Sequence, residues 1–206
     1  MSVRSKLALT ASAALVAAAT LTASGNATAS GPAPTSARAG ATYVVLKGGA
    51  TTLRLNPGTA KVLTDNGISV APASEARVRS TGIAFPIQGG LLNSKTLAGK
   101  VKHSGGLTFS AGGKDLTIRD FTINTAKKTL IAYVDEAGAR IPVLNLNLAK
   151  AKVKVTKKHL TVSNVKAKLT SGAASALNSY YSTSLFKGGL KIGTATMSAS
   201  SKILRG

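Results

Sequence analysis

The chain contains no cysteine and no tryptophan, and aromatic residues make up only 4% of its 206 residues. The absence of cysteine excludes disulfides, thiolate metal sites and a cysteine nucleophile. Bases of single-stranded nucleic acid stack on aromatic side chains, and the four tyrosines are not interleaved with the basic residues. We therefore expect no specific nucleic-acid partner.

Acidic residues are also scarce, because six Asp and Glu stand against 27 Lys and Arg. No acid follows Glu136, and the only two histidines, His103 and His159, lie far apart. No acid or His cluster has the spacing of metal ligands, and no Ser lies in a nucleophile elbow. We therefore expect no metal, no catalytic residue and no enzyme activity. An extracellular hydrolase using Asp115 and Asp120 is a remaining alternative, since glycoside hydrolysis needs two facing carboxylates.

The N-terminal segment has the pattern of an export signal. Arg4 and Lys6 precede an uncharged apolar run, and Asn26-Ala27-Thr28-Ala29 has small residues where signal peptidase cleaves. The alternative, a membrane anchor, is disfavoured because the run is short and rich in Ala and Thr. We predict a signal peptide over 1–29 cleaved near Ala29, a disordered linker over 30–41, and one β-rich domain over 42–206. The protein is then secreted.

The predicted domain is mainly β, because apolar residues alternate with polar ones between turn residues. The expected strands are 42–47, 51–55, 82–88, 99–103, 106–111, 115–124, 129–135, 139–148, 151–156, 159–169 and 191–197. Five Gly-Gly pairs, at 48–49, 89–90, 105–106, 112–113 and 188–189, are expected turn sites. Two short helices are expected, one capped by Asn56 with Pro57 at its first position, and one over 173–181 starting near Thr170 or Ser171. Ala60, Leu63 and Val62 are expected to face inward on the first.

Three expected strands change their apolar face partway along. A strand has a side-chain period of two, so each change requires a bulge or bend. The predicted sites are Arg119-Asp120, Ser163-Asn164 and 142–144. Bulges curl a sheet, so we expect a curved antiparallel sandwich or a partly closed barrel.

Lysines are concentrated in one acid-free region. Lys150, Lys152 and Lys154 alternate along one predicted strand and therefore share a face. With the next turn and strand the cluster comprises Lys150, Lys152, Lys154, Lys157, Lys158, Lys166 and Lys168. Such a field attracts polyanions, whereas the alternative is a solvated face that deters edge pairing. The leading interpretation is a secreted, non-enzymatic β-domain that associates with anionic cell-wall polymers or a membrane surface of the cell envelope.

Several short segments carry a family resemblance, namely His103-Ser-Gly-Gly-Leu107, Asp115–Ile123, Leu169–Ala173, Tyr180-Tyr181 and Gly188–Leu190. They resemble the heme-transport-associated (HtaA) domain family of exported actinobacterial proteins. The first segment is similar to that family's His-x-Gly-x-Leu stretch, and the second is similar to its next strand.

This resemblance implies a β-rich fold with short helices that binds heme through a Tyr ligand supported by a His. It makes His103, Tyr180 and Tyr181 candidate ligand-binding residues. The family's ligand Tyr lies in a segment that corresponds here to Thr51–Val70, which contains neither Tyr nor Trp. The alternative function is thus a carrier of heme or of another hydrophobic ligand such as a lipid, although no cofactor is indicated by the residues themselves.

Overall fold

The computed structural model describes residues 42–205, which form twelve strands and two helices. In chain order the elements are β1 (Thr42–Leu55), α1 (Pro57–Asp65), β2 (Ser69–Ala73), β3 (Arg77–Arg79), β4 (Gly82–Asn93), β5 (Gly99–His103), β6 (Gly106–Ala111), β7 (Lys114–Asn124), β8 (Thr129–Val134), β9 (Ala139–Asn147), β10 (Lys152–Val155), β11 (His159–Leu169), α2 (Ser171–Tyr181) and β12 (Lys191–Arg205). The predicted signal peptide and linker lie outside the described residues.

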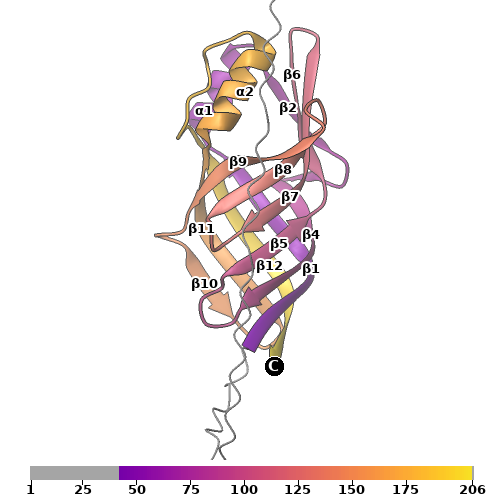
Figure 1. Ribbon diagram of the computed structural model, residues 1–206, viewed down its shortest axis with the longest axis vertical. Coiled ribbons are helices and arrows are strands. Elements are labelled where there is room, and N and C mark those ends of the chain that lie inside the picture. Colours follow the sequence, from indigo (N-terminus) through magenta and orange to yellow (C-terminus); the bar gives the residue numbers. More distant parts are fainter. Residues whose placement is uncertain (1–41, 206) are drawn as a thin grey trace, which may run out of the picture. The chain divides into compact units, whose positions relative to one another are not determined.

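Eight antiparallel strands close into a barrel (Figure 1). Their order is β7-β5-β4-β1-β12-β11-β9-β8, and β7 pairs with β8 to complete the ring. β2 and β6 extend from β7, while β3 pairs with β4 and β10 pairs with β11. The prediction of a mainly β chain with two short helices is confirmed, and the barrel alternative is the correct one, with its ring closed.

Bulges occur at all three predicted sites. The register shifts between Arg119 and Thr122 of β7 and between Val162 and Val165 of β11. A third shift lies between Leu130 and Ile131 of β8. On the partner strand β9 it leaves Val143, within the predicted site 142–144, without a register partner. Asp120 and Asn164 adopt positive φ of 53° and 61°, a conformation that Asp and Asn tolerate better than most residues. These bulges let long strands bend around the ring while both of their segments present apolar residues to its interior.

The two helices cap one end of the barrel (Figure 1). Asn56 accepts a hydrogen bond from the Thr59 amide at 3.2 Å, and Thr170 accepts one from the Ala173 amide at 3.1 Å, so both predicted N-termini are confirmed. On α1 Leu63 is buried, but Val62 is exposed, and Thr59 takes the second buried position instead. Within residues 42–205, no helix has the length and apolarity to cross a membrane.

Two of the predicted Gly-Gly turns are wrong, because Gly48-Gly49 and Gly89-Gly90 lie inside β1 and β4. The register shifts beside both pairs, between Leu46 and Gly48 and between Ile87 and Gly89. At Gly49 a Cβ would lie 2.2 Å from the Ser198 carbonyl oxygen, so only glycine allows β1 and β12 to approach this closely. The short strands β2 and β3 were not expected from the sequence.

The barrel interior contains two main apolar clusters. The helix-side cluster is built around Leu53, Leu63, Phe85, Phe121 and Phe186, and many half-buried apolar residues pack against it. The opposite cluster is smaller and includes the largest fully buried side chains, which are Leu92, Leu160, Val44 and Val101. Half-buried apolar residues are therefore more numerous around the helix-side cluster than around the opposite cluster.

Candidate functional site

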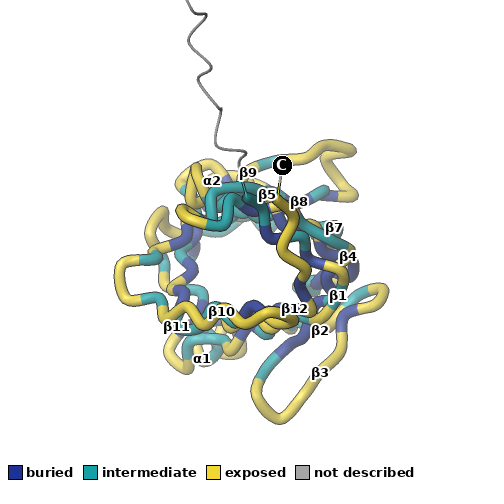
Figure 2. Tube along the Cα trace, turned by 90° about the horizontal axis from the view of Figure 1, so that it is seen from below, coloured by how far each residue is buried: buried dark blue, intermediate teal, exposed yellow. Residues whose placement is uncertain are grey.

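An apolar cavity of about 370 Å³ occupies the barrel interior. Its walls come from β1, β4, β5, β7, β9, β11 and β12 and from both helices, and they include Leu53, Phe85, Phe121, Leu169 and Leu177. Figure 2 looks along the barrel from the end away from the helices and shows these strands arranged as a ring. Cavities of this volume with few polar groups are typical of sites for small apolar ligands.

His103 is the one ionisable side chain that lines this cavity within the described residues. It is the last residue of β5, and the alternation of β5 points it inward together with Val101. Its side chain is only 4% exposed, and its Nε2 lies 2.7 Å from the Thr51 hydroxyl. Its Nδ1 is buried and has no hydrogen-bond partner among residues 42–205.

Burial lowers the pKa of His103 to about 4, because desolvation disfavours the charged imidazolium. The backbone carbonyls of Phe121 and Val101 oppose this shift to a smaller extent, although neither meets hydrogen-bond geometry with Nδ1. The ring is therefore neutral at pH 7, with one nitrogen protonated and the other carrying a lone pair.

Thr51 lies at the centre of the polar part of the wall. In the register of β1 it is opposite Met197 of β12 on one side and Phe85 of β4 on the other. Phe85 packs edge-to-face on Phe121 with ring centroids 5.0 Å apart. The Thr51–His103 pair is thus a small polar group on an apolar wall, and the Met197 thioether, which also lines the cavity, is on the adjacent strand.

Sequence reasoning missed Thr51 and Met197. Thr51 is separated from His103 by 52 positions, and a threonine in a strand has no signal that distinguishes it from an exposed one. The pairing of β4 with β1 on one side and with β5 on the other brings the two side chains into contact.

Tyr180 and Tyr181 lie at the end of α2 and connect it to the β6–β7 hairpin. The Tyr180 hydroxyl donates to the Asp115 carbonyl, and the Tyr181 hydroxyl donates to the Phe109 carbonyl at 2.8 Å. Burial, with smaller contributions from neighbouring groups, raises the pKa of Tyr181 to about 12. The structure places neither ring among the cavity walls, so it does not bring them together with His103. Their ligand-binding role stays a prediction.

The seven lysines of the predicted polyanion-binding cluster lie on the outside of the barrel in two groups. Lys152 and Lys154 face outward opposite Ser163 and Thr161, because β10 pairs with β11 as expected. Lys166 and Lys168 follow the bulge at Asn164 and are opposite Asn147 and Asn145 of β9 instead. All seven are at least partly exposed, and their binding of polyanions stays a prediction.

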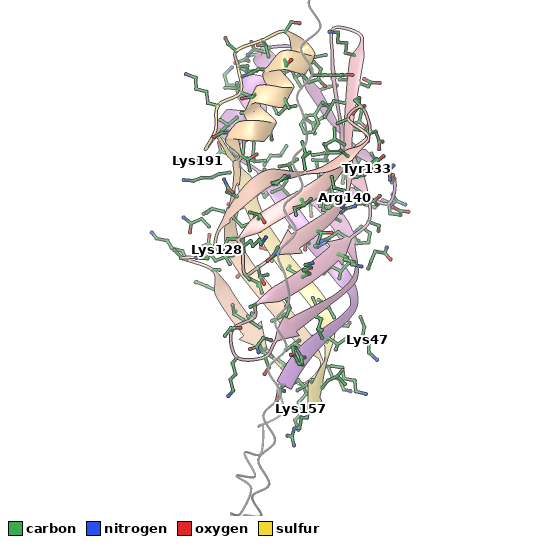
Figure 3. All side chains as sticks on the ribbon, viewed as in Figure 1. Lys47, Lys128, Tyr133, Arg140, Lys157 and Lys191 are labelled. Atoms are coloured by element: carbon green, nitrogen blue, oxygen red, sulfur yellow. The ribbon has the colours of Figure 1, made fainter. Side chains whose placement is uncertain are left out.

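The ends of the barrel strands away from the helices carry a larger set of exposed basic residues, which we name the basic pole. The basic pole comprises Lys95, Lys100, Lys127, Lys128, Lys150, Lys152, Lys154, Lys157, Lys158, Lys202 and Arg205. Figure 3 shows Lys157 at the bottom of the barrel, away from the helices, and Lys128 about halfway up on one side. No carboxylate lies on β9, β10, β11, β12, β1, β4 or β5.

The acidic residues gather nearer the helices and around one arginine. Arg119 pairs with Asp120 at 2.6 Å and with Asp135 at 2.7 Å, and its guanidinium lies 4.7 Å from the Tyr133 ring centroid. The hydrogen bond that Arg119 Nε donates to the Asp135 carboxylate is the largest cause of a raised Arg119 pKa. Arg140 is opposite Tyr133 in the register, and Figure 3 shows these two side chains next to each other on the outer surface.

Asp115 and Asp120 both point outward on β7, because the residues beside them, Leu116 and Phe121, are buried. Asp120 is engaged with Arg119, and the Asp115 carbonyl is held by Tyr180. Within residues 42–205 no group of three His, Asp or Glu could hold a metal ion. The two carboxylates therefore border the outer surface and not the cavity.

Comparisons with known proteins give one family and one fold. The HtaA family model (described as Htaa) matches residues 42–185. The structure is similar to the C-terminal domain of HtaA from Corynebacterium glutamicum, with a TM-score of 0.58 and 16% identity, over 77% of this chain and 99% of that one. It is also similar to a domain-swapped dimer of a histidine-to-alanine variant of that domain, with a TM-score of 0.50 and 17% identity, over 69% of this chain and 90% of that one. The heme-binding protein HtaB from the same organism matches with a TM-score of 0.47 and 14% identity, over 79% of this chain and 97% of that one. A search of curated proteins finds no match.

Proposed function

The chain belongs to the HtaA family, and from this premise we propose that it binds heme inside the barrel cavity. The observation that carries the proposal is the apolar cavity of about 370 Å³ with the buried neutral His103 on its wall. Transfer of an apolar macrocycle from water to such a cavity is favourable, because each Å² of apolar surface that is buried contributes about 25 cal/mol of free energy. The resemblance of the segment around His103 to the family's His-x-Gly-x-Leu stretch supports the same ligand.

The residues present fit a heme. Imidazole and thioether groups are established iron ligands, and His103 and Met197 supply one of each on the cavity wall. The unpartnered Nδ1 of His103 is the observation that favours this residue, because a buried polar atom without a partner is rare unless a ligand uses it. The bound iron would supply the metal-centred absorption and redox chemistry of the complex.

The chain departs from the expected iron ligation in one respect. The family resemblance implies a Tyr ligand supported by a His, and the hydroxyl that contacts His103 here belongs to Thr51. A threonine hydroxyl does not ionise near neutral pH, unlike the phenol of Tyr, whose ordinary pKa is about 10. We therefore assign iron ligation to His103, and Thr51 acts as a positioning residue that orients the imidazole.

A titration with hemin tests the proposal. The purified protein should give a saturable, shifted Soret band, and His103→Ala should weaken binding at least about tenfold, equivalent to about 1.4 kcal/mol. His159→Ala is the matched control, because His159 is exposed on β11 and lies outside the cavity. An unshifted Soret band at high protein concentration would refute heme binding.

A second variant separates loss of the ligand from loss of the fold. Ala176 lies on α2 at the edge of the cavity and is exposed, so Ala176→Phe fills the cavity without removing a buried contact. Hemin binding should weaken while the far-ultraviolet circular dichroism spectrum is unchanged. Normal hemin binding by Ala176→Phe would place the heme elsewhere.

A second candidate function is association with the cell envelope, favoured by the absence of carboxylates from seven neighbouring strands. The predicted export signal and the exposed lysines support it, since a basic surface attracts anionic polymers. Binding to isolated cell envelopes should be lost in about 1 M salt, where the screening length is about 3 Å. Binding that survives this salt concentration would exclude an electrostatic association. For both candidate functions, we propose that the protein is exported and that it has no enzyme activity.

A further inference from the structure

The basic pole also carries most of the exposed apolar side chains. Seven large apolar residues are exposed among residues 42–205, and five of them lie in this half of the barrel. These five, Leu91, Val153, Val155, Ile203 and Leu204, are between 42% and 50% exposed. Val153, Val155 and Ile203 are register partners of the inward-facing Val162, Leu160 and Val44, so they point toward the barrel interior at this end. Leu91 and Leu204 lie on the outer face beside lysines, and exposed apolar residues grouped on a surface indicate an interaction site.

The strand register places apolar and basic residues in one patch on the outer face of β12, β1, β4 and β5. Lys202, Val45, Leu91 and Lys100 are successive register partners across these four strands. The neighbouring row pairs Leu204 with Tyr43. Cross-strand partners on the same face lie about 4.5–5.5 Å apart, so apolar side chains form the middle of this patch and lysines its two sides.

We infer that this pole docks on the surface of an anionic lipid bilayer. Exposed apolar side chains partition into the interface between headgroups and acyl chains, and basic residues beside them are attracted to anionic headgroups. A soluble polyanion would use the lysines but would leave Leu91 and Leu204 in water. The presence of both kinds of side chain in one patch therefore favours a bilayer.

The distribution of carboxylates supports the orientation of this docking. Asp65, Glu75, Asp135 and Glu136 lie in α1 or in turns of the helix-side half, Asp115 lies at the start of β7, and Asp120 lies midway along β7. None of them is within the basic pole. An anionic bilayer would thus attract the basic pole more strongly than the helix-capped end, because only the latter half contains carboxylates that offset its basic residues, and this difference favours one orientation. The inference does not depend on heme binding, and it names the partner that the second candidate function leaves open.

Vesicle co-sedimentation tests the inference, using equal parts of phosphatidylcholine and phosphatidylglycerol. The purified protein should bind these vesicles and should not bind vesicles of phosphatidylcholine alone. The double variant Leu91→Asn, Leu204→Asn should bind at least about tenfold more weakly, because each leucine contributes by its buried area. Val78→Asn is the matched control, since Val78 is 70% exposed on β3 in the helix-side half and its loss should change nothing.

The outcomes separate the inference from both proposed functions. If the double variant binds the vesicles as the unchanged protein does, or if neither binds, docking on a bilayer is refuted even where binding to cell envelopes persists. If phosphatidylcholine vesicles bind equally well, the anionic requirement is refuted. Hemin binding should be equal in the double variant and in Val78→Asn, because neither change touches the cavity.

Discussion

The two halves of the barrel differ in how completely their apolar side chains are packed. The helix-side half contains three phenylalanines in its cluster, yet many of its apolar residues are only half-buried because they border the cavity. The opposite half is packed around Leu92, Leu160, Val44 and Val101, none of which is more than 2% exposed. Its outer surface is basic. The comparison indicates that the most completely packed side chains lie in the opposite half, whereas the helix-side half supplies more of the half-buried cavity wall; the cavity also reaches Leu92, Val101 and Met197 of the opposite cluster.

The largest expected effect is the destabilisation by Leu160→Ala, which the same substitution at a cavity-lining leucine should not match. Leu160 has no exposed surface in the opposite cluster, whereas Leu130 of β8 is half-buried and borders the cavity. Leu160→Ala should lower the free energy of unfolding by about 4 kcal/mol and Leu130→Ala by about 1.5 kcal/mol, because loss of a fully packed side chain adds a new void. Urea denaturation of both variants measures the difference, and equal losses would contradict it.

A smaller effect comes from the polar pair at the boundary between the halves. The pKa of His103 is about 4 in the folded protein and about 6.5 in the unfolded chain, so the unfolded chain binds more protons between these values. Stability is therefore constant above about pH 6.5 and falls by about 3 kcal/mol as the pH decreases to about 4.

Thermal or urea unfolding across this pH range checks the prediction, with variants isolating the contribution of His103 from that of the carboxylates. His103→Gln should lose this component of the pH dependence, while His159→Gln should retain it because His159 is exposed. The same slope in all three proteins would mean that His103 is not buried as a neutral group.

The smallest expected effect concerns the attachment of α2. Tyr181→Phe removes the hydrogen bond to the Phe109 carbonyl and should lower the free energy of unfolding by about 1 kcal/mol. Tyr43→Phe is the control, since within residues 42–205 the structure shows no hydrogen bond from its hydroxyl. Loss of hemin binding in Tyr181→Phe with unchanged stability would instead assign Tyr181 a direct role with the ligand.

The sequence was most informative where local chemistry decides local structure. Asn56 with Pro57 and Thr170 with the following alanines determine where the two helices begin, because an N-cap acts within one turn. The changes of apolar face in β7, β9 and β11 determined the three bulges, since a strand cannot change its inward face without one. The motif around His103 likewise indicated the family.

The sequence by itself thus determined the mainly β character of the chain, the helix starts, the bulges and the strongly basic charge. The tertiary structure alone decided that Gly48-Gly49 and Gly89-Gly90 lie within closely paired strands and not in turns. It also decided that Thr51 contacts His103 and that lysines from separate turns lie at one pole. The physical reason is ring closure: caps and periodicity act over a few residues, whereas the cavity and the pole depend on strands far apart in the chain, whose pairing partners no local pattern specifies.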